Sequence, residues 1–417
     1  MSKTGTFISV AEDQEGKNPR IITDDFPLRV NAGFGDLTTD AWGRQKVSAD
    51  YSLFHSLFTF DIPATLWLYY ENSVEVPVST TVTSINGLAN VSSGGNVSTL
   101  SARRHPRYQP NRGQLWSASM IFPNPDADGI RDFGLFDDGN GVFFRLKQVD
   151  GVGRLHACLL RGGSTVRDEL ITIPFDIDLS KGNIFDIQMQ WRGVGNIKFF
   201  AGNPETGASE LIHTLNLLNT LTTLSTEDAA MSCSFRSTNV TEDVTLQCGC
   251  VDLTSEGGGI NREQYGSAFA ENVAVNGTNS PVLVIRQPLL ISGKQNTRDI
   301  RFARATVKCS KKGTFKVWTG RDPAGIIGAT FQEINNGSFV ETDSPDVVAG
   351  AVRATSINTS LLRYITSISV EATVRTEVVN PSRETIEFFL IHGDYVIITG
   401  TFSAATAEAV IEWGEEI

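Results

Sequence analysis

The sequence predicts an all-β protein, and its composition supports this class. Glycine outnumbers proline 38 to 15, and valine, threonine, serine and phenylalanine are common, whereas stretches rich in alanine, glutamate and lysine are few. Such a composition favours strands joined by tight turns. Because one hydrophobic core seldom organises more than ~250–300 residues, a chain of 417 residues is expected to form at least two domains.

The first 30 residues are predicted to form an arm. Charged residues and the pairs Asn18-Pro19 and Phe26-Pro27 interrupt every strand or helix pattern in residues 1–30. Segments of this kind lie outside a folded core. We expect the arm to dock on a neighbouring subunit.

Residues 31–256 contain segments that alternate apolar and polar side chains, which predicts strands. The apolar face of one segment consists of Trp116, Ala118, Met120 and Phe122. The apolar face of another consists of Phe185, Ile187, Met189 and Trp191. The opposite face of that segment consists of Asp186, Gln188, Gln190 and Arg192. We expect the second segment to be an antiparallel strand whose polar face meets solvent.

Turn signals separate these strands. Residues 138–141 (Asp-Gly-Asn-Gly) predict a hairpin, because asparagine and glycine accept the positive φ of a tight turn. Residues 193–196 (Gly-Val-Gly-Asn) predict another turn. The serine- and threonine-rich residues 80–101 suit an edge strand and exposed loops better than a core.

A domain boundary is predicted at the three consecutive glycines 257–259. Short strand-like runs begin again beyond them, at residues 282–286, 301–309, 314–318, 387–392 and 410–415. Several short strands with almost no amphipathic helical windows fit a β-sandwich or jelly roll in each half. The predicted second domain is residues 257–417.

Charge and hydropathy exclude two classes of partner. The 35 basic and 47 acidic residues give a net charge of −12, which opposes attraction to nucleic acid or to anionic lipid. No stretch approaches the ~18 apolar residues of a membrane helix, and the first residues show no secretory signal. We expect neither a nucleic-acid nor a membrane partner.

The five cysteines are read as unpaired thiols. They are Cys158, Cys233, Cys248, Cys250 and Cys309. An odd number without a secretory signal disfavours a disulfide framework. Alternation predicts one buried strand face that carries Val244, Leu246, Cys248 and Cys250. A zinc site is disfavoured because it needs wider spacing and a second ligand pair. No metal or other cofactor is predicted.

Residues 124–129 (Asn-Pro-Asp-Ala-Asp-Gly) resemble the start of a calcium-binding loop. Alternate oxygen-bearing side chains can converge on one cation there, with glycine making the turn. Leu135 stands where the loop requires its twelfth-position glutamate. A solvated turn is therefore the preferred interpretation, and calcium binding is the alternative.

One dense basic cluster occupies residues 103–112 and is interpreted as a stiff, exposed loop. Its candidate contact residues are Arg103, Arg104, Arg107, Tyr108 and Arg112. Guanidinium groups bind carboxylates in bidentate fashion. A docking contact with an acidic subunit surface and a solvated loop with local ion pairs both remain open.

Catalytic motifs are absent, so the chain is not expected to be an enzyme. A nucleophile elbow, a phosphate-binding glycine loop and an H-E-x-x-H sequence are all missing. Asp137 and Asp138, like Asp36 and Asp40, are read first as turn formers, although a glycosidase needs only two well-placed acids.

Surface aromatic side chains can stack on sugars. The candidates are Trp42 and Trp67, with Tyr69 and Tyr70 beside the latter. The preferred interpretation is that residues 67–70 form one strand covered on both faces and pack in the core instead of binding sugars. Host glycan binding stays open.

Seven collinear pieces resemble a widespread family of tailed-bacteriophage virion structural proteins. They are residues 40–48 with 51–56, 108–115, 134–144, 185–195, 254–258, 283–286 and 411–413. The resemblance implies a non-enzymatic particle protein with a lectin-like sandwich followed by a second β domain. It further implies placement on the head, neck or tail, contacts with other virion proteins, and closure into a homotrimer or ring.

Three functions compete on this basis. The first is a collar, neck-fibre or head-decoration protein, made in the host cytoplasm and carried on the virion. The second is a tail receptor-binding protein that recognises host polysaccharide. The third is a polysaccharide depolymerase, which would require paired acids at strand ends.

Overall fold

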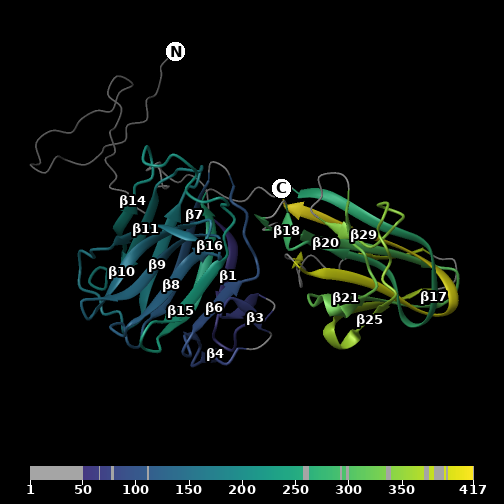
Figure 1. Cartoon of the computed structure of the whole chain (residues 1–417), viewed down its shortest axis with the longest axis horizontal. Helices are drawn as coiled ribbons and strands as arrows, with labels where there is room; N and C mark the ends of the chain where they lie inside the picture. The colour runs from purple at the N-terminus through teal and green to yellow at the C-terminus, as the bar shows by residue number, and fades with distance from the viewer. Residues whose placement is uncertain are drawn as a thin grey trace, which may run out of the picture.

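The computed structural model describes residues 50–64, 66–76, 79–109, 112–256, 263–291, 294–296, 300–334, 340–370, 375–379, 389–390 and 393–416. Within these residues the chain is all-β, as predicted, with strands and two short 3-10 helices as its regular elements. Strands up to β16 and strands from β17 onward form two separate bodies (Figure 1). The predicted arm at 1–30 and the glycines 257–259 lie outside the described residues. No helix in the described part is long and apolar enough to span a membrane.

The N-terminal body is a sandwich of two antiparallel sheets. The first sheet has the order β14-β13-β12-β7-β16-β5-β4, and β1 also pairs with β16. Its strands are β1 (Tyr51–Leu57), β4 (Val82–Ile85), β5 (Leu88–Ser92), β7 (Gly113–Ile121), β12 (Asn183–Met189), β13 (Ile197–Gly202), β14 (Ser209–Leu215) and β16 (Thr245–Glu256). The second sheet has the order β11-β10-β9-β8-β15-β6-β2-β3. Its strands are β2 (Trp67–Glu71), β3 (Val74–Val76), β6 (Val97–Ala102), β8 (Gly129–Phe136), β9 (Asn140–Val149), β10 (Val152–Arg161), β11 (Ser164–Leu170) and β15 (Cys233–Asn239).

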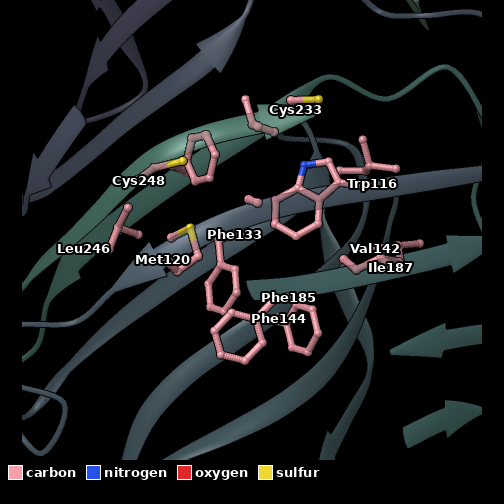
Figure 2. Close-up of a cluster of buried hydrophobic side chains, with 14 of the residues drawn as sticks. Trp116, Met120, Phe133, Val142, Phe144, Phe185, Ile187, Cys233, Leu246 and Cys248 are labelled. Atoms are coloured by element: carbon pink, nitrogen blue, oxygen red, sulfur yellow. The ribbon is translucent and has the colours of Figure 1, made fainter. Parts of the chain in front are cut away.

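The core between the two sheets is aromatic. Phe133 of β8 stacks on Phe144 of β9 with 5.1 Å between ring centroids, and Phe185 of β12 meets both rings (Figure 2). The predicted apolar face of β7 is confirmed, because Trp116 and Met120 point into this core. Interdigitated aromatic rings of this kind give a large and rigid buried surface.

The polar face of β12 is buried, which corrects the expectation of a solvated face. β12 does pair antiparallel with β7 and β13. However, Gln188 and Gln190 are 0% exposed, and Gln188 Nε2 donates to Glu256 Oε1 at 2.7 Å. Of the predicted polar face, Asp186, Gln188 and Gln190 are therefore covered, whereas Arg192 is exposed as expected.

The serine- and threonine-rich segment from 80 to 101 is also more buried than expected. β4 does lie at an edge of the first sheet, whereas β5 and β6 are inner strands. Ala89, Val91 and Leu100 are fully buried. Small and hydroxylated side chains fit this crowded part of the sandwich because their hydroxyls bond to segments packed against them, as Ser98 Oγ donates to Thr81 Oγ1, just before β4 of the other sheet, at 2.7 Å.

A β-bulge in β16 separates the two neighbouring cysteines. The register on β7 shifts between Cys248 and Cys250, so Val251 and Leu253 continue the buried face of Leu246 and Cys248. Cys250 is only half-buried and is not on that face. The prediction of one continuous face was therefore wrong beyond Cys248, because a bulge reverses the alternation.

The loop at residues 124–129 is held by an arginine. Arg131, which is fully buried, donates from its guanidinium to the main-chain oxygens of Asn124 at 2.6 Å and Pro125 at 3.1 Å. Asp126 Oδ1 accepts from Gly153 N at 2.7 Å, and Asp128 Oδ2 accepts from Thr241 Oγ1 at 2.7 Å. The loop oxygens thus bind the protein's own donors.

Both predicted turns are present, but no residue from 138 to 141 has the positive φ on which the first prediction rested. The turn at residues 138–141 joins β8 to β9, which pair antiparallel from Phe136 opposite Gly141. Gly193, with φ of 81°, lies in the turn between β12 and β13. At Gly195 a Cβ atom would lie 1.8 Å from Gln190 O, so no side chain fits there.

The C-terminal body is organised around two long strands, β17 (Glu263–Arg286) and β29 (Tyr395–Glu416). The sheet order is β23-β24-β17-β29-β20-β27, with β21 pairing β26 and β29, and β28 pairing β20. The other strands of this sheet are β20 (Ile300–Cys309), β21 (Gly313–Gly320), β23 (Gln332–Glu333), β24 (Glu341–Thr342), β26 (Arg363–Val370), β27 (Arg375–Val379) and β28 (Phe389–Leu390). The small elements are β18 (Leu290–Ile291) with β19 (Lys294–Gln295), β22 (Ile326–Ile327) with β25 (Ser356–Ile357), and the 3-10 helices η2 (Pro323–Gly325) and η3 (Thr359–Leu361).

This second body has its own core and one buried acid. Its main apolar cluster runs from Ala268 to Trp413, whereas the cluster of the sandwich ends at Leu253. Asp343 is 1% exposed and accepts from Val284 N and Ala354 N, each at 2.9 Å. Burial raises the pKa of Asp343 to about 6, although the main-chain hydrogen bonds act in the opposite direction.

Candidate functional site

The outer face of the second sheet, opposite the aromatic core, carries an aligned row of polar side chains. The antiparallel register places Tyr70 opposite Thr99, and Thr99 opposite Arg236. It also places Arg236 opposite Asp132, and Asp132 opposite Arg145. Because paired strands lie about 4.8 Å apart, these side chains form a line across β2, β6, β15, β8 and β9.

A cavity of about 210 Å³ lies at the Tyr70 end of this row, and we refer to it as the sheet pocket. Strands β2, β6 and β15, the loop after β6 and the β8–β9 turn form its walls. The lining residues are Leu68, Tyr70, Ser73, Thr99, Ser101, Ala102, His105, Phe136, Asp137, Asp138, Ser234 and Arg236. Most of the lining side chains are polar, and Leu68, Tyr70, Ala102 and Phe136 supply its apolar surface.

A buried carboxylate shared by two arginines supports one wall. Asp132 accepts from Arg236 Nη2 at 2.7 Å and from Arg145 Nε at 2.7 Å, and its side chain is 1% exposed. The Arg236 guanidinium lies over the Phe136 ring, 4.9 Å from its centroid, and Arg145 lies over Phe143 at 5.3 Å. Burial lowers the pKa of Arg145, but the hydrogen bond and charge of Asp132 raise it above its ordinary value. Two hydrogen bonds to Asp132 Oδ2 and stacking on Phe136 together fix Arg236 in place.

Serine hydroxyls fix the adjoining turn. Ser232 and Ser234 donate to the main-chain oxygen of Phe136 at 3.0 and 2.7 Å. Ser101 Oγ lies 2.9 Å from both of their hydroxyl oxygens. This network connects β6 and β15 to the end of β8, so the position of the β8–β9 turn is set by the sheet.

Two consecutive acids of that turn have different environments. Asp137 Oδ1 accepts from Gly139 N at 2.6 Å and Asn140 N at 2.7 Å, whereas the side chain of Asp138 is 77% exposed. Burial raises the pKa of Asp137 to about 6; the two amide bonds lower it, and the charges of Asp228 and Asp138 raise it further. Asp138 therefore offers its carboxylate to solvent, while Asp137 closes the turn.

Burial also shifts the pKa of two other lining groups, both of which are uncharged at neutral pH. It lowers the pKa of His105 to about 4, against the opposing charge of Asp228. It raises the pKa of Tyr70 to about 12, with a further increase from Glu75. An uncharged imidazole and phenol can still take part in hydrogen bonds.

The second body reaches the strand that borders the pocket. Arg321 Nη2 lies 2.9 Å from Glu75 Oε2 of β3, and Arg321 Nη1 lies 3.7 Å from Asp394 Oδ1. β3 pairs with β2, and Ser73 in the turn between them lines the pocket. The two bodies thus meet beside the pocket.

The predicted basic contact follows β6 but is not an exposed loop. Arg103 Nε donates to Ala64 O at 3.0 Å, and Arg104 Nη1 donates to Leu53 O at 3.3 Å. Tyr108 is buried and meets Trp191 edge-on, while Arg107 and Arg112 are half-buried. The segment packs along the sandwich because its guanidinium groups bind main-chain oxygens there. A subunit contact at these residues stays a prediction.

The aromatic candidates have different outcomes. Trp67 is 1% exposed, its Nε1 donates to Ser56 Oγ at 2.9 Å, and its ring packs against Phe54 and Phe58. It cannot stack on a sugar, so that hypothesis was wrong and the core-packing alternative holds. Trp42 lies outside the described residues. Tyr70 lines the sheet pocket.

Sequence reasoning missed Arg236 and Asp132 as site residues. The alternation of Cys233 and Phe235 with Ser234 and Arg236 marks two faces of a strand, which is a usable signal. What the sequence does not reveal is which strands become neighbours. Among the described residues, no group of three or more His, Cys, Asp or Glu side chains is placed to hold a metal ion.

Comparison with known proteins assigns the chain to no family. No protein-family model and no curated protein sequence matches the chain. Similar solved structures include a glycoside hydrolase family protein from Mycobacterium thermorestibile, with a TM-score of 0.36 and 11% identity, covering 48% of this chain and 99% of that one. Peanut lectin has a TM-score of 0.33 at 12% identity, covering 50% and 98%. The Emp47p carbohydrate recognition domain has a TM-score of 0.35 at 12% identity, covering 50% and 96%. The strand topology itself defines the chain as an all-β protein whose N-terminal body is a two-sheet β-sandwich.

Proposed function

We propose that this chain is a non-enzymatic structural protein of a tailed-bacteriophage particle, whose N-terminal sandwich recognises host-surface polysaccharide in the sheet pocket. The pocket is the observation that supports recognition. It places hydroxyl, carboxylate and guanidinium groups around a cavity of about 210 Å³ on the outer side of the second sheet. The resemblance of the seven collinear segments supports the particle role.

Sugar chemistry fits the two sides of the pocket. A sugar ring presents hydroxyls around its edge and C–H groups on its faces. Thr99, Ser101 and Asp138 supply hydrogen-bonding oxygen atoms, while Leu68 and Tyr70 supply apolar surface. The register of five strands holds these groups, so little ordering accompanies binding, which favours affinity.

The arrangement of acids supports binding without hydrolysis. The two lining carboxylates, Asp137 and Asp138, are consecutive residues of one turn and lie on one wall. A glycosidase needs acids on both sides of the scissile bond, ~5–9.5 Å apart. Asp137 also accepts two main-chain hydrogen bonds that close its turn. The purified chain should therefore release no reducing ends from host polysaccharide between pH 4 and 8.

The expected partners follow from the particle role. We propose contacts with other virion proteins, self-association into a trimer or ring, and a virion location on the collar, neck, head or tail. Immunogold labelling of particles with antibody against the chain, together with light scattering of the purified chain, tests these points. Unlabelled particles would contradict the particle role.

Receptor recognition is tested by competition. The purified chain should bind isolated host envelope and slow adsorption of the phage. Trp67→Phe should keep this activity because Trp67 lies in the core, whereas Asp138→Asn should weaken it. Absence of both binding and competition would leave a collar, neck-fibre or head-decoration role without glycan recognition.

A further inference from the structure

We propose that the sheet pocket takes one neutral sugar residue and discriminates against sugars that carry a carboxylate, sulfate or phosphate group. This inference rests on the proposed saccharide binding and specifies its ligand class. The size of the pocket and the arrangement of its charges carry it.

The size of the pocket sets the number of sugar residues. Its volume of about 210 Å³ is below the ~300–1,000 Å³ of sites for drug-sized ligands. It corresponds to about seven water molecules at ~30 Å³ each. One pyranose ring fits such a space, and the rest of a glycan chain would lie along the sheet surface.

Arg236, the arginine that lines the pocket, already binds a carboxylate of the protein. Arg236 is bonded twice to Asp132, and its Nη1 lies 4.0 Å from Asp138 Oδ1. An anionic sugar would have to compete with both carboxylates for one guanidinium group. By contrast, a hydroxyl group can donate to Asp138 without displacing either bond.

The remaining charges near the pocket do not favour an anion. Asp137 and Asp138 line it, and Asp228 acts on both Asp137 and His105. On the β2–β3 side, the cations Arg103 and Arg321 face the anions Glu75 and Asp394. Opposite charges balance on that side, so the pocket as a whole is acidic and repels an anionic ligand.

The polar and apolar walls match a neutral ring. Thr99 and Ser101 follow each other on the outer face of β6, with Tyr70 and Leu68 beside them on β2. Hydroxyl groups on one wall and carboxylate oxygens on the opposite turn suit the ring hydroxyls, which both donate and accept. An uncharged ligand satisfies these groups without bringing a buried charge.

The test uses the full chain and two sets of small probes. The neutral probes are methyl glycosides of hexoses and N-acetylhexosamines, and the anionic probes are methyl glucuronide and hexose phosphates. Binding is measured by saturation-transfer NMR and titration calorimetry. At least one neutral probe should bind about tenfold more tightly than its anionic counterpart, a difference typical of one unfavourable charge contact.

Two matched variants locate the effect. Asp138→Asn should weaken neutral binding about tenfold, because one charge-assisted hydrogen bond is lost. Asp150→Asn makes the same change in the exposed turn between β9 and β10 and should leave affinity unchanged. Asp138→Lys should raise affinity for the anionic probes. Circular dichroism verifies the fold of each variant.

The outcomes separate this inference from the proposed function. Binding of anionic probes in preference to neutral ones overturns the inference and leaves saccharide recognition standing. If neither Asp138→Asn nor Asp138→Lys changes the binding of neutral probes, the binding site lies elsewhere. That outcome also overturns the inference. Failure of every probe and of isolated host polysaccharide contradicts saccharide recognition itself.

Discussion

Replacing Asp132 with asparagine removes the charge that two arginines share beneath the sheet pocket. The carboxylate accepts four hydrogen bonds, from Arg145 at 2.7 and 3.0 Å and from Arg236 at 3.2 and 2.7 Å. An asparagine keeps one oxygen for one arginine and turns an amide donor toward the other. Two guanidinium groups, 16% and 19% exposed, would then remain without an anion between them.

The size of the effect follows from this burial. Breaking a buried ion pair by removing one partner costs about 3–5 kcal/mol, because the charge left behind stays desolvated. We therefore expect Asp132→Asn to lower the free energy of unfolding of the N-terminal sandwich by about 3–5 kcal/mol. That is a large share of the ~5–15 kcal/mol that stabilises a typical domain.

Calorimetric and urea unfolding of Asp132→Asn, Arg236→Met and the double variant provide the measurement. The double variant should lose less free energy of unfolding than the two single variants lose together. Part of the loss in Asp132→Asn comes from an uncompensated Arg236, which the double variant no longer contains. Asp150→Asn is the control, since Asp150 lies in an exposed turn of the same sheet. If Asp132→Asn and Asp150→Asn have the same free energy of unfolding, the Asp132 carboxylate does not stabilise this wall of the pocket.

Three further predictions concern single residues. Gly134→Ala should destabilise the sandwich by at least about 2 kcal/mol, because a Cβ there would lie 2.7 Å from Phe143 Cα and Val142 O. The control is Gly151→Ala, at a positive φ in open space, which should cost about 1 kcal/mol in the same urea titration. Burial raises the pKa of Asp343 from 3.8 to about 6, so Asp343 stabilises the fold fully below pH 3.8 and loses that contribution as the pH rises through about 6. The stability of wild type relative to Asp343→Asn should therefore fall by about 2 kcal/mol from pH 4 to 7, and a difference that does not change with pH would contradict the assigned burial effect. Trp67→Ala should destabilise the sandwich by about 3–5 kcal/mol, as measured by thermal unfolding, and a change below 1 kcal/mol would mean that the indole is not part of the core.

The class of fold and several elements could be predicted from the sequence because strand periodicity and turn residues act locally. The hairpin at residues 138–141 is signalled by its asparagine and glycines. In the structure no residue there has a positive φ, and Asp137 closes the turn by accepting from Gly139 N and Asn140 N. The apolar face of β7 needs only alternation over seven residues. Neither depends on the rest of the chain.

The errors arose where distant strands decide the outcome. The bulge at Gly249 reverses the faces of β16, and alternation cannot reveal it because the extra residue is accommodated by pairing with β7. Gln188 and Gln190 are polar yet buried, because neighbouring segments cover the outer face of β12. Arg236, Asp132 and Arg145 come from three strands, so their meeting depends on sheet order, which a single sequence does not encode locally.

The position of β29 in the chain has a consequence for synthesis. This strand pairs with β17, β20 and β21, yet it is made after all three. The N-terminal sandwich can close once β16 has left the ribosome, whereas β17 keeps an unpaired edge until residues 395–416 emerge. A nascent chain at that stage exposes apolar strand edges that invite aggregation. Expression of this protein should therefore depend on rapid completion of translation or on chaperones that shield the waiting strands.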